Sequence, residues 1–360
     1  METKQNANPT IRRNTGLSHV RAISCIAVVI LHTFFACFSF VGKDTIQYRS
    51  AVLIRNLMFW SVPCFVMVTG ALLLDPSRNI SYKKVFGKYI PRMLAALVVF
   101  SALFLLVDIG FGFTSWSRDT VPEFFKSLLT GQGQWSHMWY LYTMIGLYLI
   151  MPVLHAFVRV SDRKALGALT LIFFIFLSVV PILSTVTDLP FGIYIPVITI
   201  YPLYLVLGRF LVTDGLQTEE TSGEKQKGRG RRTGLFSCLI VAFAIGISIC
   251  TLIYLHKDNA MLREMVTDYS FPIIVLGAVG VFGLTESLGG HNKVLEFIDK
   301  HAFGIYLIHM VPLKILAVKK LFNPFDVGVW FVFVVAVGIF LISLLITYLL
   351  RLLPIVRKLL

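Results

Sequence analysis

Ten stretches of about 20 mainly apolar residues recur along the chain. A helix of that length crosses the hydrocarbon core of a bilayer and pairs its own backbone polar groups, which lipid cannot do. The predicted spans are residues 18–40, 53–74, 92–112, 138–158, 166–186, 192–212, 234–255, 271–289, 301–319 and 327–350. We therefore expect an all-α integral membrane protein with about ten transmembrane helices.

The composition favours the same class. Hydrophobic residues make up 56% of the chain and charged residues only 14%, compared with roughly 45–50% and about 25% in soluble domains. A soluble protein of 360 residues could not bury so much apolar surface in one or two cores. The composition therefore excludes a soluble enzyme and a disordered chain.

The basic residues are distributed unevenly between the loops. Of the 33 Lys and Arg residues, 23 fall in segments on the same side as the amino terminus, and such residues mark cytoplasmic loops. We expect both termini in the cytoplasm. The net charge of +14 then reflects this topology and contact with membrane lipids, and no nucleic-acid partner is expected.

The domain organisation is simple. Residues 1–15 are predicted to be a cytoplasmic amino-terminal tail, and residues 16–360 a single ten-helix domain. Only residues 214–233 resemble a linker, because they are polar and almost free of apolar side chains, so we expect a mobile cytoplasmic loop there. Prolines crowd the fifth and sixth spans and predict kinks at Pro181, Pro190, Pro196 and Pro202.

No metal site is expected. All five cysteines lie inside predicted spans, and neither a Cys-x-x-Cys pair nor a Cys/His spacing typical of metal ligands occurs. Small buried thiols are therefore the better interpretation.

Two ionisable residues stand out in the first predicted span, within SHVRAISCIAVVILHTFF. Arg21 and His32 project from nearly the same face of a helix, about 16 Å apart along its axis. A cation at the inner surface and an imidazole beyond the midplane suit a long ligand with an anionic head and a reactive tail. An acyl-coenzyme A thioester has that shape, and we expect both side chains to line one cavity.

Each of the two residues also has a simpler interpretation. Arg21 could be an interfacial anchor that extends to the headgroups, and a lone histidine could bond a carbonyl one turn back. An ionisable side chain inside a span is costly unless it faces a partner or a polar cavity. The shared face therefore favours a functional pair.

Three further ionisable residues are weaker candidates. His137 begins HMWYLY at the outer end of the fourth span and belongs either to an aromatic belt or to a site. His309 lies within the ninth span, where burial without a purpose is expensive. Asp108, near the outer end of the third span, could orient a histidine or reach water.

Four stretches resemble the membrane acyltransferase 3 family, whose ten-helix members modify bacterial surface polysaccharides and other extracytoplasmic sugars. Arg21 to His32 matches the family's Arg, ten residues, His pattern. SVPCFVMVTGALLL (61–74) is similar to its second helix, SHMWYLYTMIGLYLIMPVL (136–154) to the His-x-Trp-Tyr-Leu opening of its fourth, and FGIYLIHMVPL (303–313) to the Tyr-Leu-x-His of a late helix. The four stretches occur in order over nearly the whole chain.

The loop after the second span departs from the family pattern, which usually has an Arg-x-x-Arg pair before a proline. Here the sequence reads KKVFGKYIPRML, so Lys88 and Arg92 straddle Pro91. Through the resemblance we expect Arg21, Lys84, Lys88 and Arg92 to bind the coenzyme phosphates. The same basic run could also only mark the cytoplasmic side.

The resemblance implies transfer of an acyl group, usually acetyl, from cytoplasmic acyl-coenzyme A to a hydroxyl of an extracytoplasmic or lipid-linked sugar or polysaccharide, in the bacterial cytoplasmic membrane. His32 would be the general base, since a positioned imidazole can take the proton of an attacking hydroxyl. Arg21 would hold phosphates of the donor. His309 or His137 would orient the acceptor or the thioester oxygen.

Two alternatives stay open. Some relatives carry an esterase-like domain that completes the transfer, whereas the predicted helices use up these 360 residues. We expect the chain to act alone or to pass its acyl group to a separate esterase-like partner. The competing class is a carrier that exports a glycan or lipid-linked sugar through the same polar residues without acyl chemistry.

Overall fold

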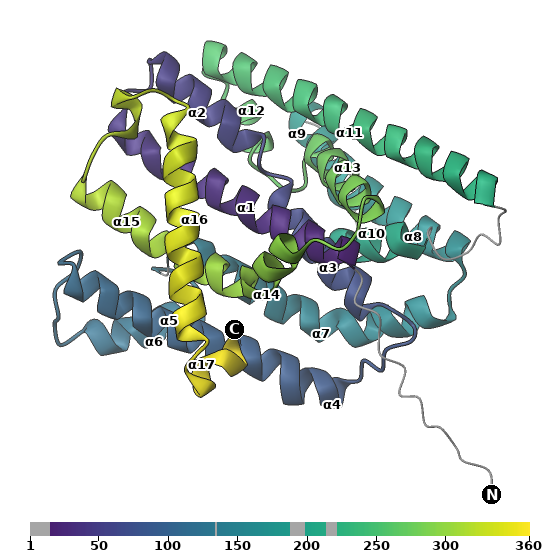
Figure 1. Cartoon of the computed structure of the whole chain (residues 1–360), viewed down its shortest axis with the longest axis horizontal. Helices are drawn as coiled ribbons and strands as arrows, with labels where there is room; N and C mark the ends of the chain where they lie inside the picture. Colours follow the sequence, from purple (N-terminus) through teal and green to yellow (C-terminus); the bar gives the residue numbers. More distant parts are fainter. Residues whose placement is uncertain (1–14, 134, 188–198, 214–221) are drawn as a thin grey trace, which may run out of the picture.

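The computed structural model describes residues 15–133, 135–187, 199–213 and 222–360, and every regular element in them is helical (Figure 1). The longer helices are α1 (Thr15–Cys37), α2 (Ile46–Asn56), α3 (Ser61–Leu73), α5 (Ile90–Gly110), α6 (Thr120–Thr130), α7 (Trp139–Val160), α8 (Arg163–Phe174), α10 (Tyr201–Thr213), α11 (Ser222–Lys257), α13 (Pro272–Ser287), α14 (Lys293–Ile308), α15 (Met310–Lys319) and α16 (Phe331–Leu350). The shorter elements are α4 (Tyr82–Lys84), α9 (Val180–Thr187), α12 (Ala260–Met265), α17 (Pro354–Leu359), the π-helical segments η2 (Val85–Tyr89) and η4 (Ile175–Val179), and the 3-10 turns η1 (Phe38–Phe40), η3 (Ser136–Met138) and η5 (Pro324–Asp326).

Eight helical segments in the described part of the chain are long and apolar enough to cross a membrane. They are Thr15–Phe40, Ile46–Leu73, Tyr82–Gly110, Ser136–Val160, Arg163–Thr187, Gly230–Lys257, Lys293–Lys319 and Phe331–Leu350. Two shorter apolar helices, Tyr201–Val212 and Pro272–Ser287, lie where the sixth and eighth spans are predicted. An all-helical, multi-pass membrane protein is thus confirmed, and the total of ten spans and the side of the termini stay predictions.

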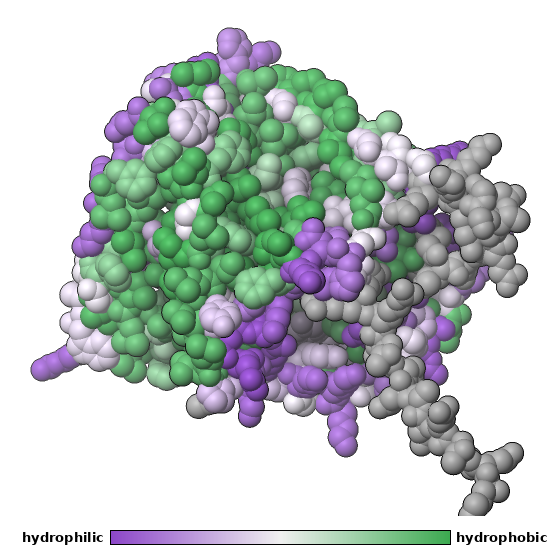
Figure 2. Space-filling model, in the orientation of Figure 1, coloured by the Kyte–Doolittle hydropathy of each residue, from purple (hydrophilic) through white to green (hydrophobic). Residues whose placement is uncertain are grey.

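The surface of the bundle is broadly hydrophobic. Figure 2 shows a wide apolar face, with hydrophilic residues gathered along the upper left edge and toward the lower right. Large exposed apolar side chains follow α11 and α16 at helical spacing: Val241, Ile245, Ile249, Leu252, Val334, Val337, Leu341 and Leu345. A continuous face of this kind is suited to lipid chains and not to water.

The short helix α10 lies in the core against α3. A Cβ atom added at Gly70 would lie 2.0 Å from the backbone oxygen of Leu205, and one added at Gly208 would lie 1.9 Å from that of Met67. The two backbones can approach so closely only because glycine has no side chain. The described side chains of α10 are consequently among the most buried in the protein.

Two prolines explain the two π-helical segments. Proline has no N–H, and its ring clashes with the carbonyl one turn before it. η2 precedes Pro91 and η4 precedes Pro181, so in both places the helix widens before the proline. At Pro181 the helix is thus distorted locally, and whether it also bends there stays a prediction. Pro202 is the second residue of α10, where a proline starts a helix and does not kink it. Pro190 and Pro196 lie outside the described residues.

The predicted loop at 214–233 is wrong in part. Helix α11 begins at Ser222, so residues 222–233 are helical, and residues 214–221 lie outside the described part. The polar stretch contains Glu, Lys, Gln and Arg, which are good helix formers, and the apolar span that follows supplies the nucleus from which the helix extends. Of the predicted tail, residues 1–14 lie outside the described residues, and α1 begins at Thr15.

The helix ends that carry polar residues form two groups. Arg21 of α1, Arg92 of α5 and Lys300 of α14 line one cavity and lie in the first halves of the spans Thr15–Phe40, Tyr82–Gly110 and Lys293–Lys319, and we call this the basic end. Asp108 of α5 and Lys314 of α15 meet near the other ends of these spans, which we call the opposite end. The candidate site lies between the two.

Candidate active site

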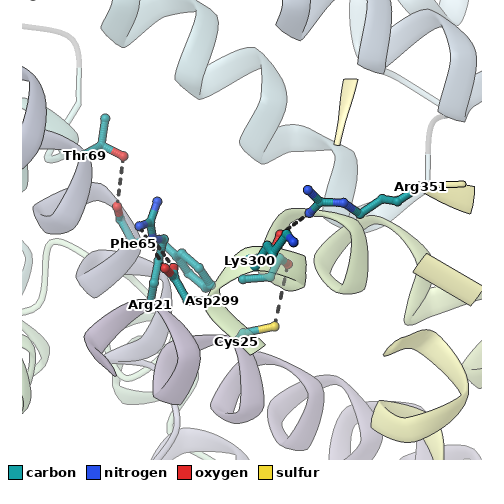
Figure 3. Close-up of polar contacts among 8 residues, drawn as sticks. Arg21, Cys25, Phe65, Thr69, Asp299, Lys300 and Arg351 are labelled. Atoms are coloured by element: carbon teal, nitrogen blue, oxygen red, sulfur yellow. Dashed lines mark hydrogen bonds and ion pairs between the residues drawn. The ribbon is translucent and has the colours of Figure 1, made fainter. Parts of the chain in front are cut away.

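Arg21 and His32 of α1 both face the span formed by α14 and α15. At the basic end, Nε of Arg21 lies 2.6 Å from Oδ1 of the buried Asp299, a pair visible in Figure 3. Further along, Nδ1 of His32 lies 3.2 Å from Nε2 of His309, the residue between α14 and α15. The spacing of Arg21 and His32 predicts that they share one face of α1. In the structure both residues on this face contact the same neighbouring span, formed by α14 and α15.

The hydrogen bonds of His32 and His309 determine which ring nitrogen carries the proton. Nδ1 of His309 lies 2.6 Å from the carbonyl oxygen of Tyr306, so in the neutral ring it donates, and Nε2 is an acceptor. Nδ1 of His32 lies between that Nε2 and the carbonyl oxygen of Val28, at 3.0 Å, so it must donate as well. Nε2 of His32 is then the unprotonated nitrogen, and no described residue hydrogen-bonds to it.

His137 joins the other two histidines. Its ring centre lies 5.5 Å from that of His309, and its Nε2 is 3.0 Å from the carbonyl oxygen of Leu307. The side chain is only 1% exposed. The aromatic-belt interpretation of His137 is therefore wrong, because a residue in that belt would face the membrane interface.

A cavity of about 360 Å³ lies at the basic end. Its lining combines charged and polar side chains with apolar and aromatic ones: Arg21, Phe65, Thr69, Arg92, Met93, Tyr140, Met144, Tyr148, Asp299, Lys300, Ala302, Phe303, Tyr306 and Leu360. The rings of Tyr306 and His309 are 5.9 Å apart, so Tyr306 separates this cavity from the histidines. The expectation that Arg21 and His32 line one cavity is therefore wrong, because His32 is not part of this lining.

A second, more polar cavity of about 630 Å³ lies at the opposite end. Its wall includes Phe104 and Trp135, whose rings stack 4.4 Å apart, and Phe104 lies 5.3 Å from His137. The three histidines thus occupy a layer between two cavities, with aromatic rings on both sides of it.

Asp108 belongs to the wall of this second cavity. Its Oδ1 lies 2.5 Å from Nζ of Lys314, and its Oδ2 accepts a hydrogen bond from Nε1 of Trp135 at 2.9 Å. Of the two roles considered for Asp108 from the sequence, orienting a histidine is wrong among the described residues, because the carboxylate bonds to Lys314 and Trp135 instead. The role of reaching water agrees with the structure, since the side chain is 17% exposed and lines this polar cavity.

The basic residues predicted to bind phosphates separate into two pairs. Arg21 and Arg92 line the cavity at the basic end, whereas Lys84 and Lys88 are exposed and do not. Nζ of Lys84 donates to the backbone oxygen of Asn79. Lys88 lies in the π-helical η2 and Arg92 in α5, and only Arg92 lines the cavity.

A further basic side chain, that of Arg351, lies beside Lys300 of this cavity. Arg351, just beyond α16, donates to the backbone oxygen of Lys300 (Figure 3). Burial, and then the nearby charges of Arg92 and Arg357, lower the pKa of Arg351. An anion placed here would relieve this repulsion. Arg351 and Lys300 are therefore additional candidates for binding phosphate.

Comparison with known proteins assigns the family. A family model described as an acyltransferase domain matches residues 14–350. The chain belongs to the acyltransferase 3 family. The resemblance noticed in the sequence is thereby confirmed, and the match includes both Arg21 and His32. No curated protein and no solved structure matches the chain.

Several residues of this acyltransferase 3 site are not predicted from the sequence. Asp299 precedes His309 by nearly the same interval that separates Arg21 from His32, and this repeated spacing could have indicated the pairing. Tyr306 is the tyrosine of the Tyr-Leu-x-His resemblance, but it was given no role, because a tyrosine in a span is common at interfaces. In the described residues, no group of three or more His, Cys, Asp or Glu side chains is arranged to hold a metal ion.

The Arg21–Asp299 pair gives a stability prediction for the acyltransferase 3 site. Arg21→Ala removes a cation that lies 2.6 Å from the buried carboxylate of Asp299, which we expect to cost on the order of 3 kcal/mol. The double variant with Asp299→Ala should recover most of this loss, because the buried carboxylate is removed as well. Thermal unfolding in detergent measures both variants, and additive losses from the two single substitutions would contradict the pairing.

Proposed function

We propose that the protein transfers an acyl group, most simply acetyl, from cytoplasmic acyl-coenzyme A to a hydroxyl of an extracytoplasmic or lipid-linked sugar or polysaccharide, in the bacterial cytoplasmic membrane. The family match supports the acyltransferase class. The observation that carries the finer proposal is the position of the histidine layer between two cavities, with an unprotonated Nε2 on His32. Such a layer can receive a donor from one side and an acceptor from the other.

The basic end suits the donor. The excess of basic residues on this side favours a cytoplasmic location for it, where acyl-coenzyme A is made. Arg92, Lys300 and Arg351 would bind the phosphates, since guanidinium and ammonium groups form strong charge-assisted bonds with them. The apolar and aromatic lining of the cavity would accommodate the pantetheine arm, and Tyr306 would turn aside to admit the thioester.

The chemistry then follows from the histidines. Nε2 of His32 takes the proton of the acceptor hydroxyl while the hydroxyl oxygen attacks the thioester carbon. The carbon–sulfur bond breaks, and the coenzyme A thiolate leaves and takes up the proton from His32. His309 accepts from Nδ1 of His32 and so holds the base in the required tautomer. The second cavity supports transfer within this chain, without a separate esterase-like partner.

The test is release of coenzyme A from acetyl-coenzyme A by the purified protein in lipid nanodiscs, followed by mass spectrometry. Surface glycans of cells with and without the gene are compared in parallel for a missing acyl mass. We expect both release and an acyl difference. A carrier would release no coenzyme A with any glycan acceptor, and that result would contradict the proposal.

A further inference from the structure

Arg55 of α2 lies within a span and has no acidic partner among the described residues. Its Nε and Nη2 donate to Oδ1 of Asn56 at 3.0 and 2.7 Å, and its Nη1 donates to no described residue. Arg21 and Lys314, by contrast, each pair with a carboxylate. A cation inside the membrane is costly to leave without a counter-charge, so Arg55 has unused capacity to bind an anion.

The surroundings hold this guanidinium in place. Its Cζ lies 5.9, 5.5 and 5.4 Å from the ring centres of Phe35, Phe38 and Phe59, respectively. Asn56 is fixed in turn, because its Nδ2 donates to Oγ1 of Thr251 of α11 at 3.0 Å. Arg55 is half-buried, and the aromatic environment screens charge less than water does. An anion that reached it would be bound strongly.

Arg55 lies near the part of the chain that carries the proposed base. Its guanidinium lies over the rings of Phe35 and Phe38, which come three and six residues after His32, and α2 packs along α1 at the end of the bundle remote from the basic end (Figure 1). Both residues lie in the half of their spans nearer the opposite end. An anion on Arg55 would therefore lie nearer the acceptor side than the donor side.

We propose that Arg55 binds an anionic group of the acceptor, a phosphate or a carboxylate, close to the hydroxyl that His32 deprotonates. Both groups accept paired hydrogen bonds from a guanidinium. The inference rests on the proposed function and narrows its substrate class to an acidic or phosphate-linked sugar. A neutral sugar would leave the charge of Arg55 without a counter-ion.

Binding of a simple amphiphilic anion tests the site without any chemical step. The probe is dodecyl phosphate, with dodecanoate as the carboxylate arm and dodecyl glucoside as the neutral control. Affinities are measured by native mass spectrometry on the full chain in zwitterionic nanodiscs, with coenzyme A present to occupy the basic end. We expect Arg55→Gln to weaken binding of dodecyl phosphate or dodecanoate at least about tenfold, a loss of roughly 1.4 kcal/mol, and to leave dodecyl glucoside unaffected.

The matched control is Arg49→Gln, which removes the same charge from an exposed position on the same helix and should change nothing. Arg55→Lys keeps the charge without the paired donors and should lose less affinity than Arg55→Gln. A preference for phosphate over carboxylate would indicate a phosphate-linked acceptor, and the reverse an acidic sugar. Equal anion binding by the wild type and a folded Arg55→Gln would overturn the site, whereas absence of coenzyme A release by the wild type would overturn the proposed function.

Discussion

Replacement of His32 by alanine is expected to lower acyl transfer by about 100- to 10,000-fold, the usual contribution of a positioned general base. The protein should still fold and insert, because the imidazole is half-buried and its Nδ1 bonds only to the carbonyl of Val28 and the ring of His309. The measurement is coenzyme A release from acetyl-coenzyme A by wild type and variant at equal amounts of inserted protein.

His19→Ala provides the matched control. His19 lies on the same helix near the basic end and is also buried, but no cavity described above includes it. Its replacement should leave the rate within a few-fold of wild type. His309→Ala should reduce the rate less than His32→Ala, since His309 only positions the base. Full activity of a folded His32→Ala variant would refute the catalytic assignment.

The second large effect concerns stability. Gly70→Ala is expected to prevent stable folding, because the new Cβ would lie 2.0 Å from the backbone oxygen of Leu205 and α3 would have to separate from α10. Overpacking in a core costs about 1–3 kcal/mol where the neighbouring side chains can move aside. A backbone oxygen in a helix can move aside less than a side chain. Yield after detergent extraction and the temperature of thermal unfolding report the loss.

Gly146→Ala on α7 is the comparison for this substitution. Nothing lies within 4 Å of a Cβ added at Gly146, and alanine is the better helix former by about 0.5–1 kcal/mol. This variant should unfold at the wild-type temperature or above. If the two alanine variants unfolded at the same temperature, the close contact between α3 and α10 would be wrong.

The class and most of the spans could be predicted from the sequence because lipid imposes a strict rule. Each span must be apolar over about 20 residues and helical throughout, and this pattern is visible without any knowledge of neighbours. The same rule makes ionisable residues conspicuous, which is why Arg21, His32 and His309 could be selected before the fold was known. Helix α13 (Pro272–Ser287) agrees with the predicted span 271–289 to within two residues, although it is shorter than the other spans.

The arrangement of the site could not be predicted, because it depends on which spans are neighbours. Asp299 pairs with Arg21 across 278 positions of sequence, and Lys314 pairs with Asp108 across 206. Tyr306 lies between the cavity and His309 because of the way α14 is turned about its own axis where it packs against α7 and α1. The periodicity of a single sequence indicates which face of each helix is buried. It does not indicate which neighbouring helix packs against that face.

The aromatic layers on both sides of the histidines have an electrical consequence. With a cavity extending inward from each end, most of the membrane voltage falls across the short barrier formed by the tyrosine, histidine and tryptophan rings. Moving one elementary charge through that barrier would change the energy by about 2.3 kcal/mol per 100 mV. An acetyl group carries no charge, and the coenzyme phosphates stay on the basic side. The turnover rate should therefore be the same in energised and de-energised proteoliposomes.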